Sequence, residues 1–291
     1  MLRAAAAPAT YPAGVTRTPA NTPRFLYGTA WKEERTERLT RLALETGFTG
    51  IDTANQRKHY HEAGVGAAVR AALASGLVTR ERLFLQTKFT HAGGQDTRLP
   101  YDPDAPVAVQ VAQSFESSLE HFGADYVDSY VLHGPTRSRG LGPEDWEAWR
   151  AMEALARAGR TRCLGVSNVT LEQLRLFYAE AEVPPAFVQN RCYARTGWDR
   201  AVRELAAEHG SVYQAFSLLT ANAAELKQPP IVSAARRTRR SPAEVVFRFA
   251  LDAGMLPLTG STNAAHLQLD LAVESLELSR DELHAIEHVS G

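Results

Sequence analysis

Short apolar runs alternate with longer amphipathic segments along most of the chain. The short runs have the length and composition of buried strands, and a polar residue closes most of them. They predict eight strands, at residues 24–28, 49–52, 83–88, 126–133, 161–167, 186–190, 211–216 and 255–258.

Apolar positions three and four residues apart fill the stretches between these strands, as expected for helices with one buried face. After the second strand, for example, Val65, Val69 and Leu73 would share one face of a helix that begins at Glu62. The same spacing predicts a helix that ends near 122, and helices at 33–46, 144–158, 171–180, 198–209, 241–252, 263–273 and 279–288. Residues 221–240 carry only short helical content.

Eight strand–helix alternations in one chain predict an α/β fold of the (β/α)8 type, the TIM barrel. An open doubly wound sheet is the alternative, but no G-x-G-x-x-G turn follows any predicted strand. We expect one barrel domain over residues 24–291. Residues 1–23 are rich in Ala, Pro and Thr and carry no acidic residue, which predicts a flexible N-terminal extension. A transit peptide is the less favoured alternative, because arginine is sparse there.

Composition narrows the class of protein without naming a function. The 291 residues are 44% hydrophobic and 22% charged, with a formal net charge of −1, as in ordinary globular proteins. That charge favours neither nucleic acid nor an anionic membrane as a partner. The two cysteines, Cys163 and Cys192, form no disulfide or zinc pattern, and we expect Cys163 to be inert core. No apolar run reaches the ~20 residues of a membrane helix. We therefore expect a cytoplasmic protein that is a monomer or a weak oligomer.

Polar side chains gather at the carboxyl ends of the predicted strands. In a barrel these ends form one rim, where active sites lie. The residues at the strand tips are Gly28, Thr29, Asp52, Lys88, His133, Ser167, Asn168, Gln189, Asn190, Phe216, Ser217 and Thr259. The arginine run Arg236, Arg237, Arg239 and Arg240 is instead expected on the opposite rim, as a solvated face.

Three of these residues, with a tyrosine close by, suggest proton delivery to a carbonyl oxygen. A phenol has a pKa near ~10 and donates its proton poorly, but a neighbouring ammonium should lower that value. Lys88 could act in this way on Tyr60, with Asp52 holding the ammonium charged and in place. His133 could orient the carbonyl oxygen as it gains negative charge. None of these side chains supplies hydride, so a nicotinamide cofactor is implied.

The motifs around these residues resemble the aldo-keto reductases over almost the whole chain. They are Gly50-x-Asp52-Thr53-Ala54, Leu85-x-Thr87-Lys88, Tyr130-x-Leu132-His133, Gly165-Val166-Ser167-Asn168, Val188-Gln189-Asn190, and Pro242-Ala243-Glu244-Val245 leading to Pro257. Each motif is weak alone, but six in order at strand ends are a strong signal. The resemblance implies reduction of an aldehyde or ketone to an alcohol, with NADPH as cofactor and NADH as the alternative.

The resemblance also assigns residues. Asp52, Lys88 and His133 match the family's catalytic positions, and Tyr60 would donate the proton. Residues expected around the cofactor are Gly28, Thr29, Asp52, Ser167, Asn168, Gln189, Phe216, Ser217, Leu219, Thr259, Ser261, Thr262 and Asn263. Those expected around a small carbonyl substrate are Trp31, Tyr60, His133 and Gly134, although Trp31 could instead pack under the first loop. The histidines His59, His61 and His91 lack a compact ligand spacing, so no metal site is predicted.

The sequence also departs from the family pattern. Tyr60 lies eight residues after Asp52, whereas the family's tyrosine lies five after and that position holds Arg57. We expect the loop to bulge and deliver Tyr60, with His59 and His61 as alternative donors. The eighth loop lacks the lysine or arginine that often binds the 2′-phosphate; His266 could contribute there. Gly134 replaces a frequent tryptophan, and the C-terminal loop is expected to be short, which together predict an open pocket.

Two other classes remain open on the sequence alone. A barrel that binds cofactor for regulation, with little or no turnover, would explain the shifted tyrosine. An unrelated lyase or isomerase barrel would bind neither nicotinamide cofactor.

Overall fold

In the computed structural model, which describes residues 18–290, eight parallel strands close into a barrel. Each strand pairs with the next one along the chain, and the last pairs with the first. The strands are β1 (Leu26–Gly28), β2 (Gly50–Asp52), β3 (Phe84–Phe89), β4 (Val127–Leu132), β5 (Thr161–Ser167), β6 (Phe187–Arg191), β7 (Val212–Phe216) and β8 (Met255–Thr259). The predicted (β/α)8 barrel is confirmed, and the open sheet is excluded.

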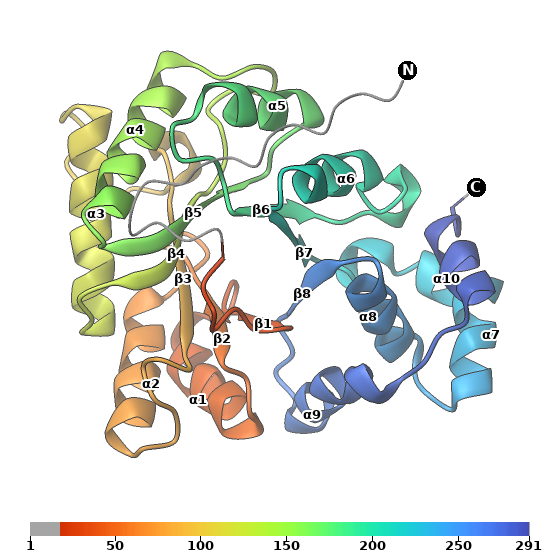
Figure 1. Cartoon of the computed structure of the whole chain (residues 1–291). Coiled ribbons are helices and arrows are strands. Elements are labelled where there is room, and N and C mark those ends of the chain that lie inside the picture. The colour runs from red at the N-terminus through yellow and green to blue at the C-terminus, as the bar shows by residue number, and fades with distance from the viewer. Residues whose placement is uncertain (1–17, 291) are drawn as a thin grey trace.

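Helices surround the barrel and cover its strands (Figure 1). The α-helices are α1 (Thr36–Thr46), α2 (Glu62–Ala74), α3 (Val107–Phe122), α4 (Pro143–Arg157), α5 (Leu171–Glu180), α6 (Arg200–Glu208), α7 (Pro229–Thr238), α8 (Pro242–Asp252), α9 (Ala264–Ala272) and α10 (Arg280–Glu287). Short 3-10 turns are η1 (Glu33–Arg35), η2 (Ala92–Gly94), η3 (Ala194–Thr196), η4 (Thr220–Asn222), η5 (Glu225–Lys227) and η6 (Val273–Ser275). The larger core lies between strands and helices, because every second strand residue points outward.

The residues that point into the barrel form a second, smaller core. Leu26, Phe84, Phe187 and Leu256 pack there, and the two phenylalanine rings meet edge to face at 5.5 Å. Moving toward the carboxyl ends of the strands, the inward positions become polar. The barrel therefore has an apolar floor and a polar rim, the distribution expected when the rim carries the site.

Helix α7 is an addition to the predicted elements, which allowed only short helical content in residues 221–240. Gln228 precedes two prolines, and a proline at the first helical position is favourable because its missing N–H has no intrahelical partner there. Ile231, Ala234 and Ala235 are buried along one face of this helix. The pattern is short and is followed by four arginines, so it gives a weak signal in the sequence.

The expected N-terminal extension is only partly described, since residues 1–17 lie outside the described range. Residues that follow them already pack on the barrel. The Asn21 side-chain amide donates to the Leu83 carbonyl at 2.8 Å and to the Asp128 carboxylate at 3.0 Å. Asn21, which the prediction assigned to the extension, is thus hydrogen-bonded to β3 and β4 or their flanks.

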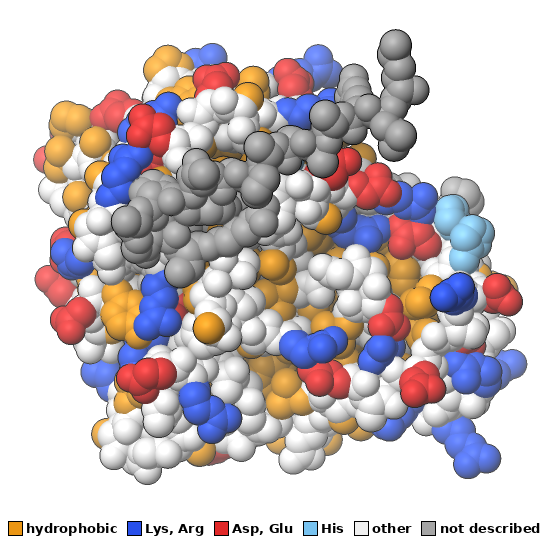
Figure 2. Space-filling model, viewed as in Figure 1, with side chains coloured by type: hydrophobic (Ala, Val, Ile, Leu, Met, Phe, Trp, Pro, Cys, Tyr) orange, Lys and Arg blue, Asp and Glu red, His pale blue; other side chains and the backbone are white. Residues whose placement is uncertain are grey.

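Two surface properties bear on the class of protein. Among the helices of residues 18–290, none combines the length and hydropathy that crossing a membrane requires. The face in Figure 2 mixes acidic and basic side chains around its edge, with hydrophobic side chains visible near its centre. A mixed surface of this kind gives that face no extended patch of a single charge.

Candidate active site

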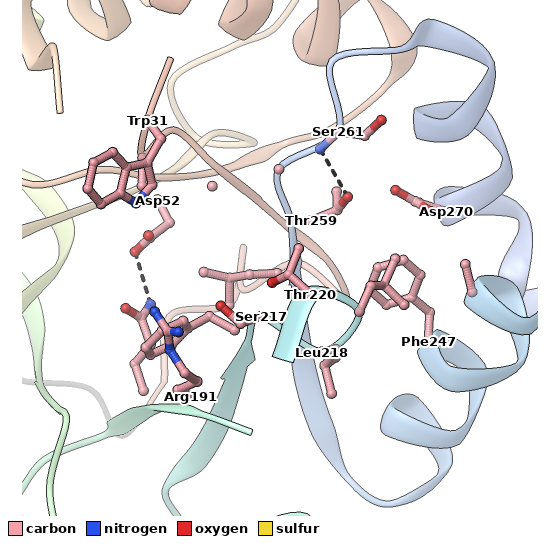
Figure 3. A pocket seen from close by; sticks show the side chains of 18 of the residues that line it. Trp31, Asp52, Arg191, Ser217, Leu218, Thr220, Phe247, Thr259, Ser261 and Asp270 are labelled. Atoms are coloured by element: carbon pink, nitrogen blue, oxygen red, sulfur yellow. Dashed lines mark hydrogen bonds between the residues drawn. The ribbon is translucent and has the colours of Figure 1, made fainter. Parts of the chain in front are cut away.

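A cavity of about 850 Å³ opens at the carboxyl ends of the strands. It extends from Asp52 and Trp31 at one end to Phe247 and Asp270 at the other, with the chain after β7 between them (Figure 3). Its volume lies within the range of small-molecule and cofactor sites.

Most of the residues predicted from the strand tips line this cavity. The predicted residues that do so are Gly28, Trp31, Asp52, Tyr60, His133, Ser167, Asn168, Gln189, Phe216, Ser217, Leu219, Thr259 and Ser261. Five others do not: Thr29, Lys88, Gly134, Thr262 and Asn263. Thr29 is buried and donates its hydroxyl to the Asp52 carbonyl at 3.0 Å, so it supports β2 rather than facing the cavity.

Lys88 lies beneath the cavity floor in an ion pair with Asp52. Its ammonium nitrogen is 2.6 Å from the Asp52 carboxylate and 2.8 Å from the Thr53 carbonyl oxygen. The Lys88 side chain is fully buried and that of Asp52 is 4% exposed. Burial lowers the pKa of Lys88, and the charge and hydrogen bond of Asp52 oppose that shift. Asp52 therefore acts as the counter-ion that a buried ammonium needs.

Glutamine side chains donate to the same Asp52 oxygen, Oδ1, that Lys88 binds. Gln86 and Gln189 both donate to the same carboxylate oxygen, at 2.7 and 3.0 Å. Gln214 crosses the barrel interior to exchange two hydrogen bonds with Gln86, and it accepts a third from Gln189. Both N–H groups of the Gln189 side chain are thus engaged, which leaves its side-chain oxygen, Oε1, as the group it can offer to the cavity.

The loop after β2 bulges in a way that brings Tyr60 over this ion pair. The Tyr60 N–H donates to the Gln56 carbonyl at 3.0 Å, which closes a turn across the additional residues. Gln56 donates to Gly94 in η2, and Asn55 donates to Ser114 on α3, so the loop is fixed to the following β3–α3 unit. Arg57 points away as an exposed residue of the turn.

Tyr60 lies between the other three candidate catalytic residues. Its ring centroid is 5.4 Å from the Lys88 ammonium and 5.9 Å from the His133 ring. The expectation that Lys88 lowers the pKa of Tyr60 is wrong for this structure. Burial raises that pKa, and the negative charge of Asp52 adds to the rise, because Lys88 is already paired with Asp52. Tyr60 is therefore held as a neutral phenol.

His133 faces the cavity from the end of β4. Its Nδ1 atom is 2.7 Å from the Thr90 hydroxyl, and its carbonyl oxygen accepts a hydrogen bond from Asn168 at 2.8 Å. Burial lowers the pKa of His133 to about 3, with the positive charge of Lys88 and then His59 adding to the shift. The imidazole is neutral at any ordinary pH and can act only as a neutral donor or acceptor.

This lowered pKa predicts an acid-dependent loss of stability. Between about pH 6.5 and pH 3 the imidazole of unfolded chains is protonated while His133 in the fold is not, so the unfolded state binds more protons. The free energy of unfolding contributed by this group is complete above about pH 6.5 and declines as the pH falls. We expect urea unfolding at pH 7, 6, 5 and 4 to show a weaker decline for His133→Gln than for the wild type. The exposed His284→Gln is the control; equal slopes for wild type and His133→Gln would contradict the prediction.

The middle of the cavity carries an amide and hydroxyl group beside an aromatic ring. The Ser167 hydroxyl donates to the backbone carbonyl of Gln189 at 2.7 Å and is 3.1 Å from the side-chain amide of Asn168. Phe216 follows on β7 with its ring only partly buried. Asn168 and Ser217 both adopt left-handed backbone conformations, with φ of 54° and 59°. Such strained turns are found at ligand sites, where they aim backbone groups at the ligand.

The far end of the cavity is less suited to an anion than the sequence indicated. We expected free N–H groups at the start of α9, but the Asn263 side chain accepts from the N–H groups of Ala265 and His266. Those donors are satisfied within the helix. Asp270 lines the same end, and burial raises the pKa of its carboxyl group to about 6. The lining of this end thus combines a capped helix with an acidic side chain.

Other residues line the cavity without having been assigned to the site, although His59 and His266 were named as alternatives and Ala243 and Glu244 stand in a quoted motif. They are Ala30, Lys32, His59, Arg191, Leu218, Thr220, Ser241, Ala243, Glu244, Phe247, Leu258, Gly260, His266, Leu269 and Asp270. Lys32 is the most informative, since its ammonium is almost buried and donates to the Gly260 carbonyl between β1 and β8. Its position directly after Trp31 was the available signal.

The arginine run is not on the rim that we expected. Ser241 and Glu244, at the start of α8, line the cavity, so the preceding arginines approach the same rim as the site. The reason is that α8 leads into β8, which is parallel to β7, so α8 begins at the rim where β7 ends. Arg237 pairs with Glu282 on α10, and Arg240 pairs with Glu244 at 3.2 Å.

The fold and the cavity together define a (β/α)8-barrel enzyme with a buried ion pair, a phenol and an imidazole at one end of an elongated ligand site. The family model of the Aldo/keto reductase family matches residues 24–290, and the chain belongs to that family. It is accordingly an oxidoreductase that reduces aldehydes or ketones to alcohols with NAD(P)H.

Individual relatives agree with this membership. An aldo-keto reductase of Mycobacterium marinum is 31% identical over 254 residues, covering 87% of this chain and 82% of the relative. The crystal structure of an aldo/keto reductase from Brucella melitensis has a TM-score of 0.77 at 26% identity, covering 92% of this chain and 95% of that one. The structure of a Bombyx mori aldo-keto reductase in complex with NADP has a TM-score of 0.76 at 24% identity, with 92% and 89% covered.

Proposed function

We propose that Tyr60, Lys88, Asp52 and His133 are the catalytic group of this reductase. The observation that carries the proposal is the position of the Tyr60 ring, which faces the cavity within 6 Å of both the Lys88 ammonium and the His133 ring. The four side chains come from separate parts of the sequence, and the barrel collects them at one end of the cavity.

The lining residues fit a nicotinamide dinucleotide. Ser167, Asn168 and Gln189 would hold the carboxamide group, with the Gln189 carbonyl oxygen accepting from its N–H because the Gln189 donors are committed. Phe216 would stack on the ring, and Ser217, Leu219 and Lys32 would surround the pyrophosphate. When bound, the reduced nicotinamide supplies the hydride that the carbonyl carbon receives. The amide and hydroxyl groups at one end of the cavity, the Phe216 ring and the buried Lys32 together support this assignment.

Side chains of the protein would then transfer the proton. Tyr60 holds a proton on its hydroxyl oxygen and delivers it to the carbonyl oxygen as negative charge develops there. Burial and Asp52 raise the pKa of Tyr60 overall, and the Lys88 ammonium, 5.4 Å from the ring, would be the positive charge that partly offsets them once the phenolate forms. His133 is neutral, so it orients the carbonyl oxygen by a hydrogen bond without competing as an acid.

We further propose a carbonyl compound of considerable size as the substrate. The cavity volume of about 850 Å³ supports this. Gly134 adds no support, because it lies outside the cavity lining and a Cβ there would already be in ordinary contact with Asn168 at 3.5 Å. Trp31 is 66% exposed beside the cavity and contacts His59 in a tilted arrangement with ring centroids 4.0 Å apart, which supports a role at the substrate and not packing under the first loop. The proposal includes NADPH as the usual cofactor, and a monomer or weak oligomer working in the cytoplasm without nucleic-acid or membrane partners.

A panel of carbonyl compounds tests the function. The protein is mixed with NADPH or NADH and with aldehydes and ketones of increasing size, and oxidation of the cofactor is followed. Turnover of at least one carbonyl class supports the proposal. Quenching of protein fluorescence by NADPH without oxidation would favour a regulatory barrel, and failure to bind either cofactor would contradict the cofactor site.

Substitution of Trp31 tests the proposed substrate contact. Aromatic stacking contributes about 0.5–1.5 kcal/mol, so we expect Trp31→Ala to lose about 3- to 10-fold in kcat/KM for an aromatic aldehyde. The value for the smallest aldehyde, measured alongside as the control, should change little. Turnover restricted to very small aldehydes, or an equal loss for both substrates, would count against Trp31 as a substrate-binding residue.

A further inference from the structure

Thr90 lies outside the cavity, next to His133, which lines the cavity. It follows β3, is 5% exposed, and its hydroxyl is 2.7 Å from Nδ1 of His133. The Thr90 carbonyl oxygen is bound separately by the Tyr101 hydroxyl at 2.7 Å, so the segment is fixed on both sides. His133 is the only hydrogen-bond partner of the Thr90 hydroxyl within residues 18–290.

This contact matters because a neutral imidazole carries one proton on one of two nitrogens. A neutral His133 with its proton on Nδ1 would donate to Thr90, and its Nε2 would face the cavity as an acceptor. With the proton on Nε2, Thr90 donates to Nδ1 and the histidine presents an N–H group to the cavity.

The hydrogen-bonding balance distinguishes the two forms. In the Nδ1–H form the Thr90 hydroxyl accepts, and its own proton has no acceptor in this buried position. An unpaired buried donor costs free energy, whereas the Nε2–H form satisfies both groups. The Nε2–H form is also the one that can donate to a carbonyl oxygen, because Nδ1 is covered by Thr90.

We propose that Thr90 is a positioning residue that fixes His133 as the Nε2–H tautomer, so that the imidazole presents a donor to the substrate carbonyl oxygen. The inference rests on the proposed role of His133 and adds the residue that determines whether its Nε2 atom donates or accepts a hydrogen bond. Thr90 itself touches neither the cavity nor the reacting atoms.

Nitrogen NMR of the histidine side chains tests the tautomer directly. The signals of His133, one of nine histidines, are identified by their loss in His133→Gln. We expect a protonated Nε2 and an unprotonated Nδ1 in the wild type, and a mixture of tautomers in the near-isosteric Thr90→Val. Thr90→Ser, which keeps the hydroxyl, should restore the wild-type pattern. Thr40→Val, which removes a buried hydroxyl on α1 that has no hydrogen-bond partner, is the matched control.

Kinetics supply a second readout. Thr90→Val should lower kcat by about 10- to 100-fold, as for other supporting groups of catalytic histidines, with the KM for cofactor within about twofold. Thr90→Ser should regain most of kcat. A wild-type spectrum with the proton on Nδ1 overturns the inference, and so does Thr90→Val with an unmixed Nε2–H form. Since the wild-type spectrum needs neither turnover nor a variant that folds, failure of the proposed reaction is distinguishable from failure of this inference.

Discussion

Tyr60→Phe is expected to lower the turnover of a carbonyl substrate by about 10²- to 10⁴-fold, the range by which general acids accelerate reactions. The substitution removes only the hydroxyl, while the ring remains between Lys88 and His133. Cofactor affinity should therefore stay within about twofold, since the residues that would hold the cofactor are untouched. Single-turnover oxidation of NADPH and fluorescence titration measure the two quantities separately.

Tyr193→Phe is the matched control, because Tyr193 lies after β6 and does not line the cavity. It should retain wild-type turnover. If Tyr60→Phe turns over at an undiminished rate, Tyr60 is not the proton donor. The next residue to test is then His59, which also lines the cavity, whereas His61 is exposed at the start of α2 and lies outside it.

The second large effect is expected on stability as well as activity. Lys88→Met leaves the Asp52 carboxylate buried without its counter-ion, and breaking such a pair costs about 3–5 kcal/mol. We expect the free energy of unfolding, measured in urea, to fall by that amount and turnover to be lost. Asp52→Asn/Lys88→Met should be more stable than Lys88→Met by at least about 1 kcal/mol, because no unpaired charge remains.

The exposed Lys227→Met controls for loss of a lysine, and we expect it to change the free energy of unfolding by less than about 0.5 kcal/mol. Equal destabilisation in Lys88→Met and the double variant would mean that packing, and not the unpaired carboxylate, sets the loss. Wild-type turnover in Lys88→Met would remove the ammonium from the proposed mechanism.

The sequence predicted the barrel well because each strand is a short apolar run that ends at a polar residue. That pattern survives in the structure at Asp52, His133 and Gln189, which all reach the cavity. The elements it describes poorly are those without such a boundary. Helix α7 begins with two prolines and ends among arginines, so its buried face of three small or branched residues was too short to recognise.

The site was predicted less completely than the fold, for a related reason. Strand tips identify residues at one level of the rim, but Phe247 and Asp270 reach the cavity from α8 and α9. The direction of the Tyr60 pKa shift was also mistaken, because the sequence indicated the Lys88–Asp52 pair but not the burial of the phenol, which raises that pKa. Alternate residues of a strand face the same side of the sheet. Gln86 lies two residues before Lys88 on β3, so this alternation could have identified it as a residue of the barrel interior.

The amide pair of Gln86 and Gln214 has a consequence for the supply of protons. It spans the barrel directly under Asp52, and below it the rings of Phe84 and Phe187 fill the interior. Within residues 18–290, the open route to the Tyr60 hydroxyl therefore runs through the cavity mouth. In the proposed mechanism, each proton that Tyr60 gives to a substrate would therefore be replaced from solvent along the path by which the alcohol departs.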